Sequence, residues 1–137
     1  MSRATRLLLP WLLIALVALA ASALRFGVIE PPAMADLCGA DGGPGWCAWR
    51  QWAVLAFLSY GYGYAALTAA FIALVARHPL AAWLAAALGM AALVLYCFEA
   101  GAFALLVGAL RLLRAQAAAL APGQQYRQRE GEVQPQP

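Results

Sequence analysis

The chain has 137 residues, of which 65% are hydrophobic and only 11% are charged. A soluble domain normally carries about a quarter charged residues, so this chain has too few polar side chains to cover a surface that faces water. Its basic residues are all arginines, and they lie at the ends of apolar runs rather than on one solvated face, which excludes a nucleic-acid-binding surface. The composition predicts a single-domain, all-α membrane protein, and its richness in Ala, Leu, Gly and Arg favours a bacterial source.

The first apolar run covers residues 7–24 and follows Arg3 and Arg6. One interpretation is a cleaved signal peptide with a small-residue site at Ala21-Ser22-Ala23. The other is a retained first transmembrane helix, because the run is longer than a usual signal core and Trp11 lies near its entry. We expect retention, and the signal peptide stays open as the alternative.

Residues 25–50 are predicted to form the one substantial loop between spans. Pro31-Pro32 should hold the chain extended as it leaves the membrane, and the glycines around Pro44 favour tight turns over a regular element. In an oxidising compartment, Cys38 and Cys47 should form a disulfide that closes a loop of about ten residues, worth roughly 2.5–3 kcal/mol. The alternatives are a redox-active pair and cysteines that are unpaired or metal-bound, although catalytic pairs favour the closer Cys-x-x-Cys spacing.

The second span is predicted at about 52–76. Trp46, Trp49 and Trp52 are interpreted as lipid-interface anchors where it enters the membrane. Tyr60 and Tyr64 share a face near its middle, and their hydroxyls need partners in hydrocarbon. We expect them to pack against other helices, with the binding of a quinone, haem or lipid tail as the alternative.

The long apolar stretch at 79–114 is too long for one crossing, since a single helix would run roughly 54 Å against a hydrocarbon core of about 30 Å. A turn at Glu99-Ala100-Gly101 would divide it into spans at about 80–98 and 100–116. Glu99 would then mark a turn at the membrane face. Alternatively it is a partly buried acid that pairs with Tyr60, Arg25 or Arg50 and serves as a proton or cation site.

Small residues four apart predict close helix packing within these spans. The pairs are Ser59/Gly63, Gly61/Ala65, Ala85/Gly89 and Ala104/Gly108. Cys97 is expected to be a small buried hydrophobe, with thiol exchange toward the loop cysteines as the alternative. At the far end Arg111 and Arg114 are interpreted as anchors to acidic lipids, and residues 122–137 as a disordered tail.

Arginine positions predict the orientation. With four spans, one side receives Arg3, Arg6, Arg77, Arg111, Arg114, Arg127 and Arg129. The other side receives only Arg25 and Arg50, together with Glu30, Asp36, Asp41 and Glu99. The positive-inside rule therefore places both termini in the cytoplasm and loop 25–50 in the periplasm of a bacterial inner membrane.

We therefore expect a four-helix transmembrane bundle over residues 1–121, with one external loop and a disordered cytoplasmic tail. The sequence carries no phosphate loop, metal-ligand motif or catalytic motif, so we expect no metal, no cofactor and no enzyme activity. The leading functional hypothesis is a non-catalytic accessory or assembly subunit that binds a membrane-protein partner or a second copy of itself. The alternatives are a thiol or quinone redox protein that uses Cys38, Cys47 and Cys97, and a small oligomeric transporter with Glu99 as its polar site.

Overall fold

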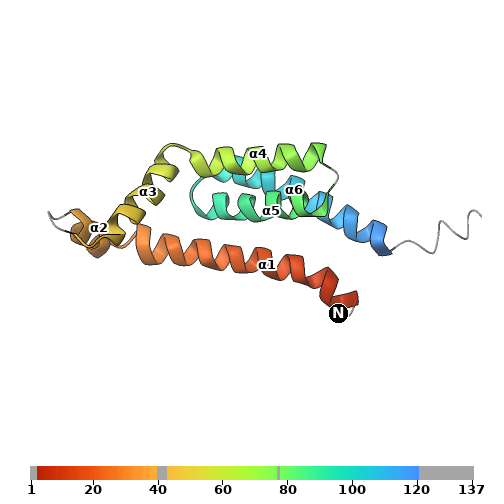
Figure 1. The fold of residues 1–137 in the computed structure, drawn as a ribbon, viewed down its shortest axis with the longest axis horizontal. Helices are drawn as coiled ribbons and strands as arrows, with labels where there is room; N and C mark the ends of the chain where they lie inside the picture. Colours follow the sequence, from red (N-terminus) through yellow and green to blue (C-terminus); the bar gives the residue numbers. More distant parts are fainter. Residues whose placement is uncertain (1–2, 40–42, 77, 121–137) are drawn as a thin grey trace, which may run out of the picture.

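The computed structural model describes residues 3–39, 43–76 and 78–120. Within these ranges the chain is helical and contains no strand, which confirms the all-helical expectation. The elements in chain order are α1 (Arg3–Leu24), the π-helical turn η1 (Arg25–Ile29), α2 (Pro32–Gly39), α3 (Trp46–Leu58), α4 (Gly61–Val75), α5 (Pro79–Val94) and α6 (Phe98–Leu120) (Figure 1). The predicted disordered tail at 122–137 lies outside the described residues.

Helices α5 and α6 form an antiparallel hairpin in which the two backbones nearly touch. A Cβ atom added to Gly89 would lie 2.8 Å from the carbonyl oxygen of Gly101, and one added to Gly108 would lie 2.6 Å from that of Ala82. Only glycine fits at such distances, because a real side-chain carbon keeps farther from backbone atoms. The close packing predicted at Ala85/Gly89 and Ala104/Gly108 is therefore confirmed, and it occurs between two helices of the same chain.

Helix α4 packs against both members of this hairpin. Its inward face is lined by small residues, and Ala66 and Ala70 are completely buried beside Ala92 and Ala104. We call α4, α5 and α6 the core. Helix α1 lies along the other side of α5 (Figure 1) and buries only Ile14 and Ala21 among its described residues. The core is thus a compact three-helix unit, and α1 is attached to its flank.

The predicted span at 52–76 is wrong as a single straight helix. Helix α3 ends at Leu58, α4 begins at Gly61, and the two are bent by 64°. Tyr60 stands at the bend with φ of 59°, in the left-handed region, and a residue in that conformation cannot continue a right-handed helix. Helix α3 therefore leaves the direction of α4 and runs toward α1 (Figure 1).

The turn of the α5–α6 hairpin also differs from the prediction. Helix α5 ends at Val94 and α6 begins at Phe98, so the predicted boundaries at 98 and 100 lie four and two residues too late. Tyr96 has φ of 70°, and the backbone N–H of Cys97 donates to Ala92 O at 2.8 Å, which closes the turn. Glu99 consequently lies in the first turn of α6, where a carboxylate interacts favourably with the helix dipole.

The segment at 25–50 is more regular than the predicted loop. Helix α1 continues into η1, and Glu30 has φ of −78° and ψ of −30°, which is helical rather than extended. Pro32 then begins α2, a position where its missing N–H costs nothing, and Trp46 begins α3. The predictions of an extended exit from the membrane and of a loop without regular elements are therefore wrong. Residues 43–45 are not helical, as predicted, and residues 40–42 lie outside the described residues.

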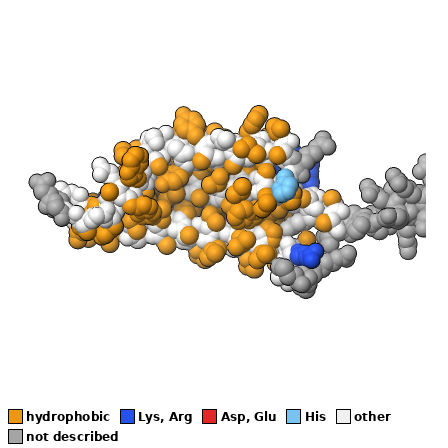
Figure 2. All heavy atoms as spheres, in the orientation of Figure 1, with side chains coloured by type: hydrophobic (Ala, Val, Ile, Leu, Met, Phe, Trp, Pro, Cys, Tyr) orange, Lys and Arg blue, Asp and Glu red, His pale blue; other side chains and the backbone are white. Residues whose placement is uncertain are grey.

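Two described helices are long and apolar enough to cross a membrane, at Thr5–Ile29 and Phe98–Ala119. The bent pair α3 and α4 would add a third if it counts as one span, and α5 is apolar but shorter. These apolar helices are compatible with a membrane location. Hydrophobic side chains cover most of the face drawn in Figure 2, and the arginines visible there lie at the end where α4 ends and α5 begins.

Candidate functional site

Polar side chains gather at the end of the molecule where η1 and α3 meet the α5–α6 turn. We call η1, α2 and α3 the arm. Arg25 begins η1 and Glu30 follows its last residue, Arg50 comes from α3, and Tyr96 comes from the turn of the core. These side chains connect the arm to the core.

The π-helical turn brings Arg25 and Glu30 together. The backbone N–H of Glu30 donates to Arg25 O at 2.9 Å, an i→i+5 bond that widens the helix by one residue. In a regular α-helix, side chains five residues apart point in different directions, whereas the wider turn places them one above the other. The Arg25 Nε atom donates to Glu30 Oε1 at 2.8 Å as a result.

The same arginine also reaches the core. Its Nη1 atom donates to Val94 O at 2.9 Å, and Val94 is the last residue of α5, where carbonyls lack partners within the helix. The guanidinium carbon lies 3.8 Å from the centroid of the Tyr96 ring, and the Tyr96 hydroxyl donates to Glu30 Oε1. Arg25, Glu30 and Tyr96 therefore form a closed triangle of one ion pair, one hydrogen bond and one cation–π contact.

These contacts shift the pKa values of both acids in the triangle. The pKa of Glu30 is lowered, first because the Tyr96 hydroxyl donates to its carboxylate and second because Arg25 does so too. The pKa of Tyr96 is raised, chiefly because its proton is held by Glu30. The triangle is therefore complete when Glu30 is ionised and Tyr96 is neutral, which is the state at neutral pH.

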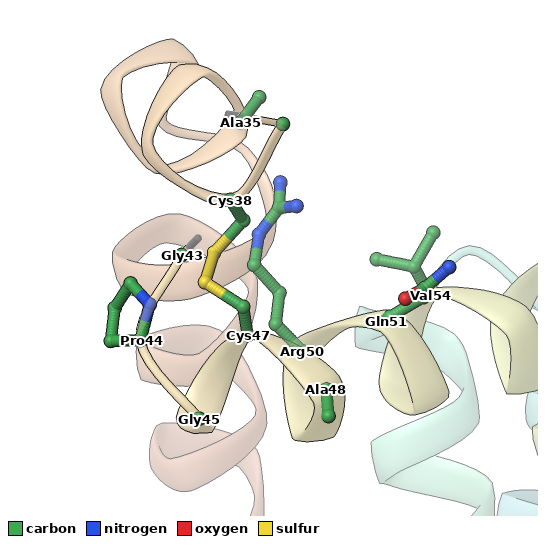
Figure 3. A pocket seen from close by; sticks show the side chains of 11 residues that line it. Ala35, Cys38, Gly43, Pro44, Gly45, Cys47, Ala48, Arg50, Gln51 and Val54 are labelled. Atoms are coloured by element: carbon green, nitrogen blue, oxygen red, sulfur yellow. A yellow bond between two sulfur atoms is a disulfide. The ribbon is translucent and has the colours of Figure 1, made fainter. Parts of the chain in front are cut away.

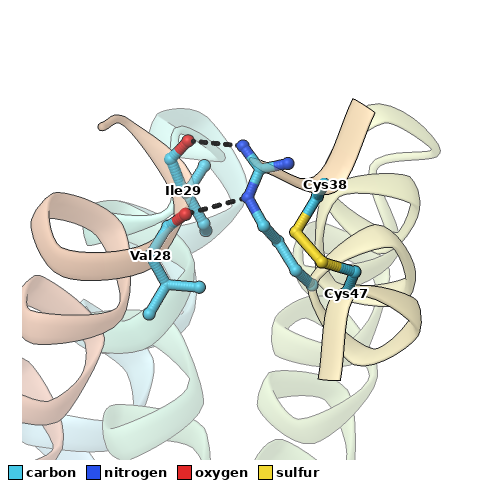
Figure 4. The surroundings of a disulfide bond; sticks show 5 residues. Val28, Ile29, Cys38 and Cys47 are labelled. Carbon is cyan, nitrogen blue, oxygen red and sulfur yellow. Dashed lines mark hydrogen bonds between the residues drawn. A yellow bond between two sulfur atoms is a disulfide. The ribbon is translucent and has the colours of Figure 1, made fainter. Parts of the chain in front are cut away.

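Arg50 fastens α3 to the end of η1. Its Nε atom donates to Val28 O at 2.9 Å and its Nη2 atom to Ile29 O at 3.2 Å (dashed in Figure 4). These carbonyls end a helical segment and have no following turn to accept from, so the guanidinium replaces the missing donors. The planar fork of an arginine suits two adjacent carbonyls, which one ammonium group cannot contact with the same geometry.

The predicted disulfide is present. Cys38 at the end of α2 is joined to Cys47 at the start of α3, with Cα atoms 5.4 Å apart. The bond lies at the edge of an open pocket of about 460 Å³ between the two helices, and Arg50, Gln51 and Val54 line the same pocket (Figure 3). The disulfide and Arg50 together define the geometry of the arm.

The structure does not bring Glu99 to this site. Its side chain is exposed on α6, and no hydrogen bond or ion pair reaches it from the described residues. Arg25 and Arg50, two of its expected partners, are bonded elsewhere. Tyr60, the third, packs edge-on against Tyr64 with ring centroids 5.7 Å apart, and both rings are exposed.

Tyr62 has the structural role that we expected of its neighbours. Its hydroxyl donates to Ala53 O at 3.3 Å and so connects α4 to α3 across the bend. Its ring packs beside Cys97, which is a free thiol, 1% exposed, within a cluster of alanines. The expectation that Cys97 is a buried small residue is confirmed, and neither Cys38 nor Cys47 belongs to its cluster.

The predicted lipid anchors lie in two places. Trp46, Trp49 and Trp52 are exposed along α3. Arg111 and Arg114 lie at the opposite end of the core, where the Arg111 guanidinium donates to Leu74 O near the end of α4. Their contact with lipid stays a prediction.

Glu30 and Tyr96 are the functional candidates that sequence reasoning missed. The sequence indicates Glu30 only as one of the acidic residues on the external side, and Tyr96 only as part of an apolar run. Their contact depends on a π-helical turn and on a left-handed tyrosine, and neither leaves a mark in the local sequence. No protein-family model, no curated protein and no solved structure matches this chain.

Proposed function

We propose that this protein is a non-catalytic accessory or assembly subunit of a larger complex in a bacterial inner membrane. In this proposal α1, α4, α5 and α6 cross the membrane as an antiparallel four-helix bundle, both termini are cytoplasmic, and the arm lies outside. The observation that carries the proposal is an uncovered leucine ridge on α1.

Charge at the two ends of the molecule supports this orientation. Arg111 and Arg114 line one pocket with His78 and Pro79 at the start of α5. Arg6 precedes Leu7, whose carbonyl accepts from Gln116 at the same end of α6. The arm end holds acidic Glu30 and Asp36 beside its arginines. The positive-inside rule assigns the first end to the cytoplasm. Helix α3, bent away from α4, then lies near the outer surface, where tryptophans are favoured.

The leucine ridge occupies one face of α1. Successive members are four, four, three and seven residues apart, so they share one face of α1 and of its continuation η1: Leu8, Leu12, Leu16, Leu19 and Phe26, all exposed. Polar bonds hold both ends of the helix, since Gln116 of α6 bonds Trp11 and Leu7 O near the start, and Arg25 bonds Val94 O at the far end. A helix held at both ends presents a rigid ridge, which is the shape that packs into the groove of another helix.

The ridge on α1 is a different candidate partner surface from the small-residue faces that the sequence indicates. Small-residue faces could also receive partner helices, but those of α5 and α6 pack against each other in the structure. In this proposal the partner engages the ridge on α1.

Photo-crosslinking tests the proposal. A benzoylphenylalanine at Leu12, which is 65% exposed, should give one discrete protein adduct in the native membrane. The matched control is Leu106 on α6, which is 63% exposed and should give lipid adducts only. Identical adduct patterns at the two positions would contradict the partner assignment.

A second candidate function is thiol–disulfide exchange by Cys38 and Cys47. Cys47 is the second residue of α3, Arg50 follows one turn later, and both line the open pocket. A helix N-terminus and a nearby guanidinium both stabilise a thiolate. Equilibration with glutathione separates the possibilities, because a structural disulfide has a potential below about −300 mV and an exchanging one lies near −200 mV.

A further inference from the structure

The cytoplasmic end assigned above contains a second polar feature, a pocket between the end of α4, the start of α5 and the end of α6. Its volume is about 200 Å³. His78, Arg111 and Arg114 line it together with alanines and Pro79, and no acidic side chain is among the lining residues that the structure describes. We call it the basic pocket.

The side chains that line the basic pocket offer more hydrogen-bond donors than acceptors. Arg111 and Arg114 are three residues apart and lie on one side of α6. Of these two side chains, only that of Arg111 donates a hydrogen bond to the described residues, toward Leu74 O. His78 accepts a hydrogen bond at Nδ1 from the N–H of Leu80 at 3.3 Å, so its neutral ring carries the proton on Nε2 as a further donor. Such a pocket favours an anion.

An apolar groove adjoins the basic pocket on the other side of the start of α5. It is about 290 Å³ and is lined by Leu9, Pro10, Leu13, Leu80, Trp83 and Leu112, with Pro79 shared between the two cavities. The Trp83 Nε1 atom donates to Pro10 O at 3.1 Å, so the polar group of the indole is satisfied and its ring offers only apolar surface.

We propose that the two cavities form one site for an anionic phospholipid, with the phosphate in the basic pocket and an acyl chain in the apolar groove. Both features lie at the same level of α5, within residues 78–83. A free phosphate would fill the pocket and leave the groove uncovered, and a neutral lipid would leave the arginines unpaired. A lipid whose headgroup carries net negative charge matches both the basic pocket and the apolar groove. The site requires a membrane location and is independent of any partner on α1.

The test uses the full-length protein in mild detergent, titrated with phosphatidylglycerol or phosphatidylcholine and followed by native mass spectrometry. Each basic residue near an anionic lipid contributes about 1 kcal/mol, so two arginines predict about 30-fold preference for phosphatidylglycerol. Arg114→Gln should lower that affinity about fivefold, and Arg114→Lys should retain most of it. The matched control is Arg6→Gln, which removes an exposed arginine of the same end that does not line either cavity.

Inorganic phosphate and glycerol 3-phosphate complete the experiment, because they carry the anion without the chain. The proposal expects neither to displace phosphatidylglycerol at millimolar concentration. Displacement by either would overturn the role of the groove. Equal binding of the two phospholipids, or equal losses in Arg6→Gln and Arg114→Gln, would overturn the role of the pocket.

Discussion

The core and the arm are held together by different physics. In the core, glycine and alanine let the backbones of α5 and α6 come into contact, and no polar side chain is buried among the described residues. In the arm, a disulfide, Arg50 and the triangle of Arg25, Glu30 and Tyr96 connect elements that share few apolar contacts. Packing thus stabilises the helices that lie side by side, and discrete polar bonds hold the part that extends beyond them.

The polar bonds follow one rule at both ends of the molecule. Three helical segments end in carbonyls that lack partners, and each is met by an arginine from another element. The pairs are Arg50 with Val28 and Ile29, Arg25 with Val94, and Arg111 with Leu74. A guanidinium remains charged and can contact several acceptors at once, which accounts for the use of arginine at these positions.

The largest effect is expected when the backbone contact of the core is broken. Gly108→Ala places a Cβ atom against the backbone of α5, which must move, and we expect a loss of about 3 kcal/mol in the free energy of unfolding. The control is Gly27→Ala in η1, where nothing lies within 4 Å of an added Cβ, so stability should stay the same or rise slightly. Unfolding by SDS in mild detergent, followed by circular dichroism, measures both. Equal losses in the two variants would show that the core does not depend on this contact.

Removal of the disulfide should have the next largest effect, and it should be local. Cys38→Ser with Cys47→Ser opens a loop of about ten residues and should cost the arm about 2.5 kcal/mol on the chain-entropy model. Hydrogen exchange should become faster in α2 and α3 while the amides of α5 and α6 keep their protection. Equal acceleration in the core would mean that arm and core unfold as one unit.

Arg50→Gln should loosen the same region by a smaller amount. The carbonyls of Val28 and Ile29 lose charged donors, and we expect a loss of about 1.5 kcal/mol, seen as faster exchange in α3. Arg114→Gln, which removes an exposed arginine at the far end, is the control and should leave α3 unchanged. A wild-type exchange rate in Arg50→Gln would contradict the capping role.

The smallest effect is expected from pH. Because the pKa of Glu30 is lowered in the folded protein, its contribution is complete above the ordinary carboxyl pKa of 4.5 and is lost as the pH falls through the lowered value. Because the pKa of Tyr96 is raised, its contribution is complete below the ordinary value of 10.0 and is lost as the pH rises through the raised one.

Tyr96→Phe sharpens this pH prediction. It removes the hydrogen bond that lowers the pKa of Glu30 most, so exchange in the arm should accelerate at a higher pH during acid titration than in the wild type. The control is Tyr64→Phe, because the Tyr64 hydroxyl makes no hydrogen bond among the described residues. Identical acid midpoints in Tyr96→Phe and wild type would contradict the triangle.

The apolar runs and the small-residue spacing were sufficient to predict the helices of the core, because close helix packing needs small side chains at regular intervals. The two bends were not predictable in detail. Both depend on a tyrosine, Tyr60 or Tyr96, in the left-handed region, a conformation that glycine adopts far more often. The length of the apolar run and its single acid instead predict a turn at Glu99-Ala100-Gly101, a few residues later than the observed one.

Of the candidate site, only the disulfide was predictable, because its two cysteines are close in sequence. The disulfide is predicted from two cysteines nine positions apart in one segment expected to face an oxidising compartment, and the Cα atoms of Cys38 and Cys47 lie 5.4 Å apart in the structure. The pairing of Glu30 with Tyr96 joins residues 66 positions apart and depends on how α1 lies along α5. Tertiary arrangement of that kind has no local sequence pattern.

Thiol labelling in intact cells tests the central claim most directly, that the arm lies outside a membrane that the core crosses. After reduction, Cys38 and Cys47 should react with a bulky impermeant maleimide in intact cells, while buried Cys97 should react only after denaturation. Reaction of Cys38 and Cys47 only after lysis would place the arm in the cytoplasm and contradict the account.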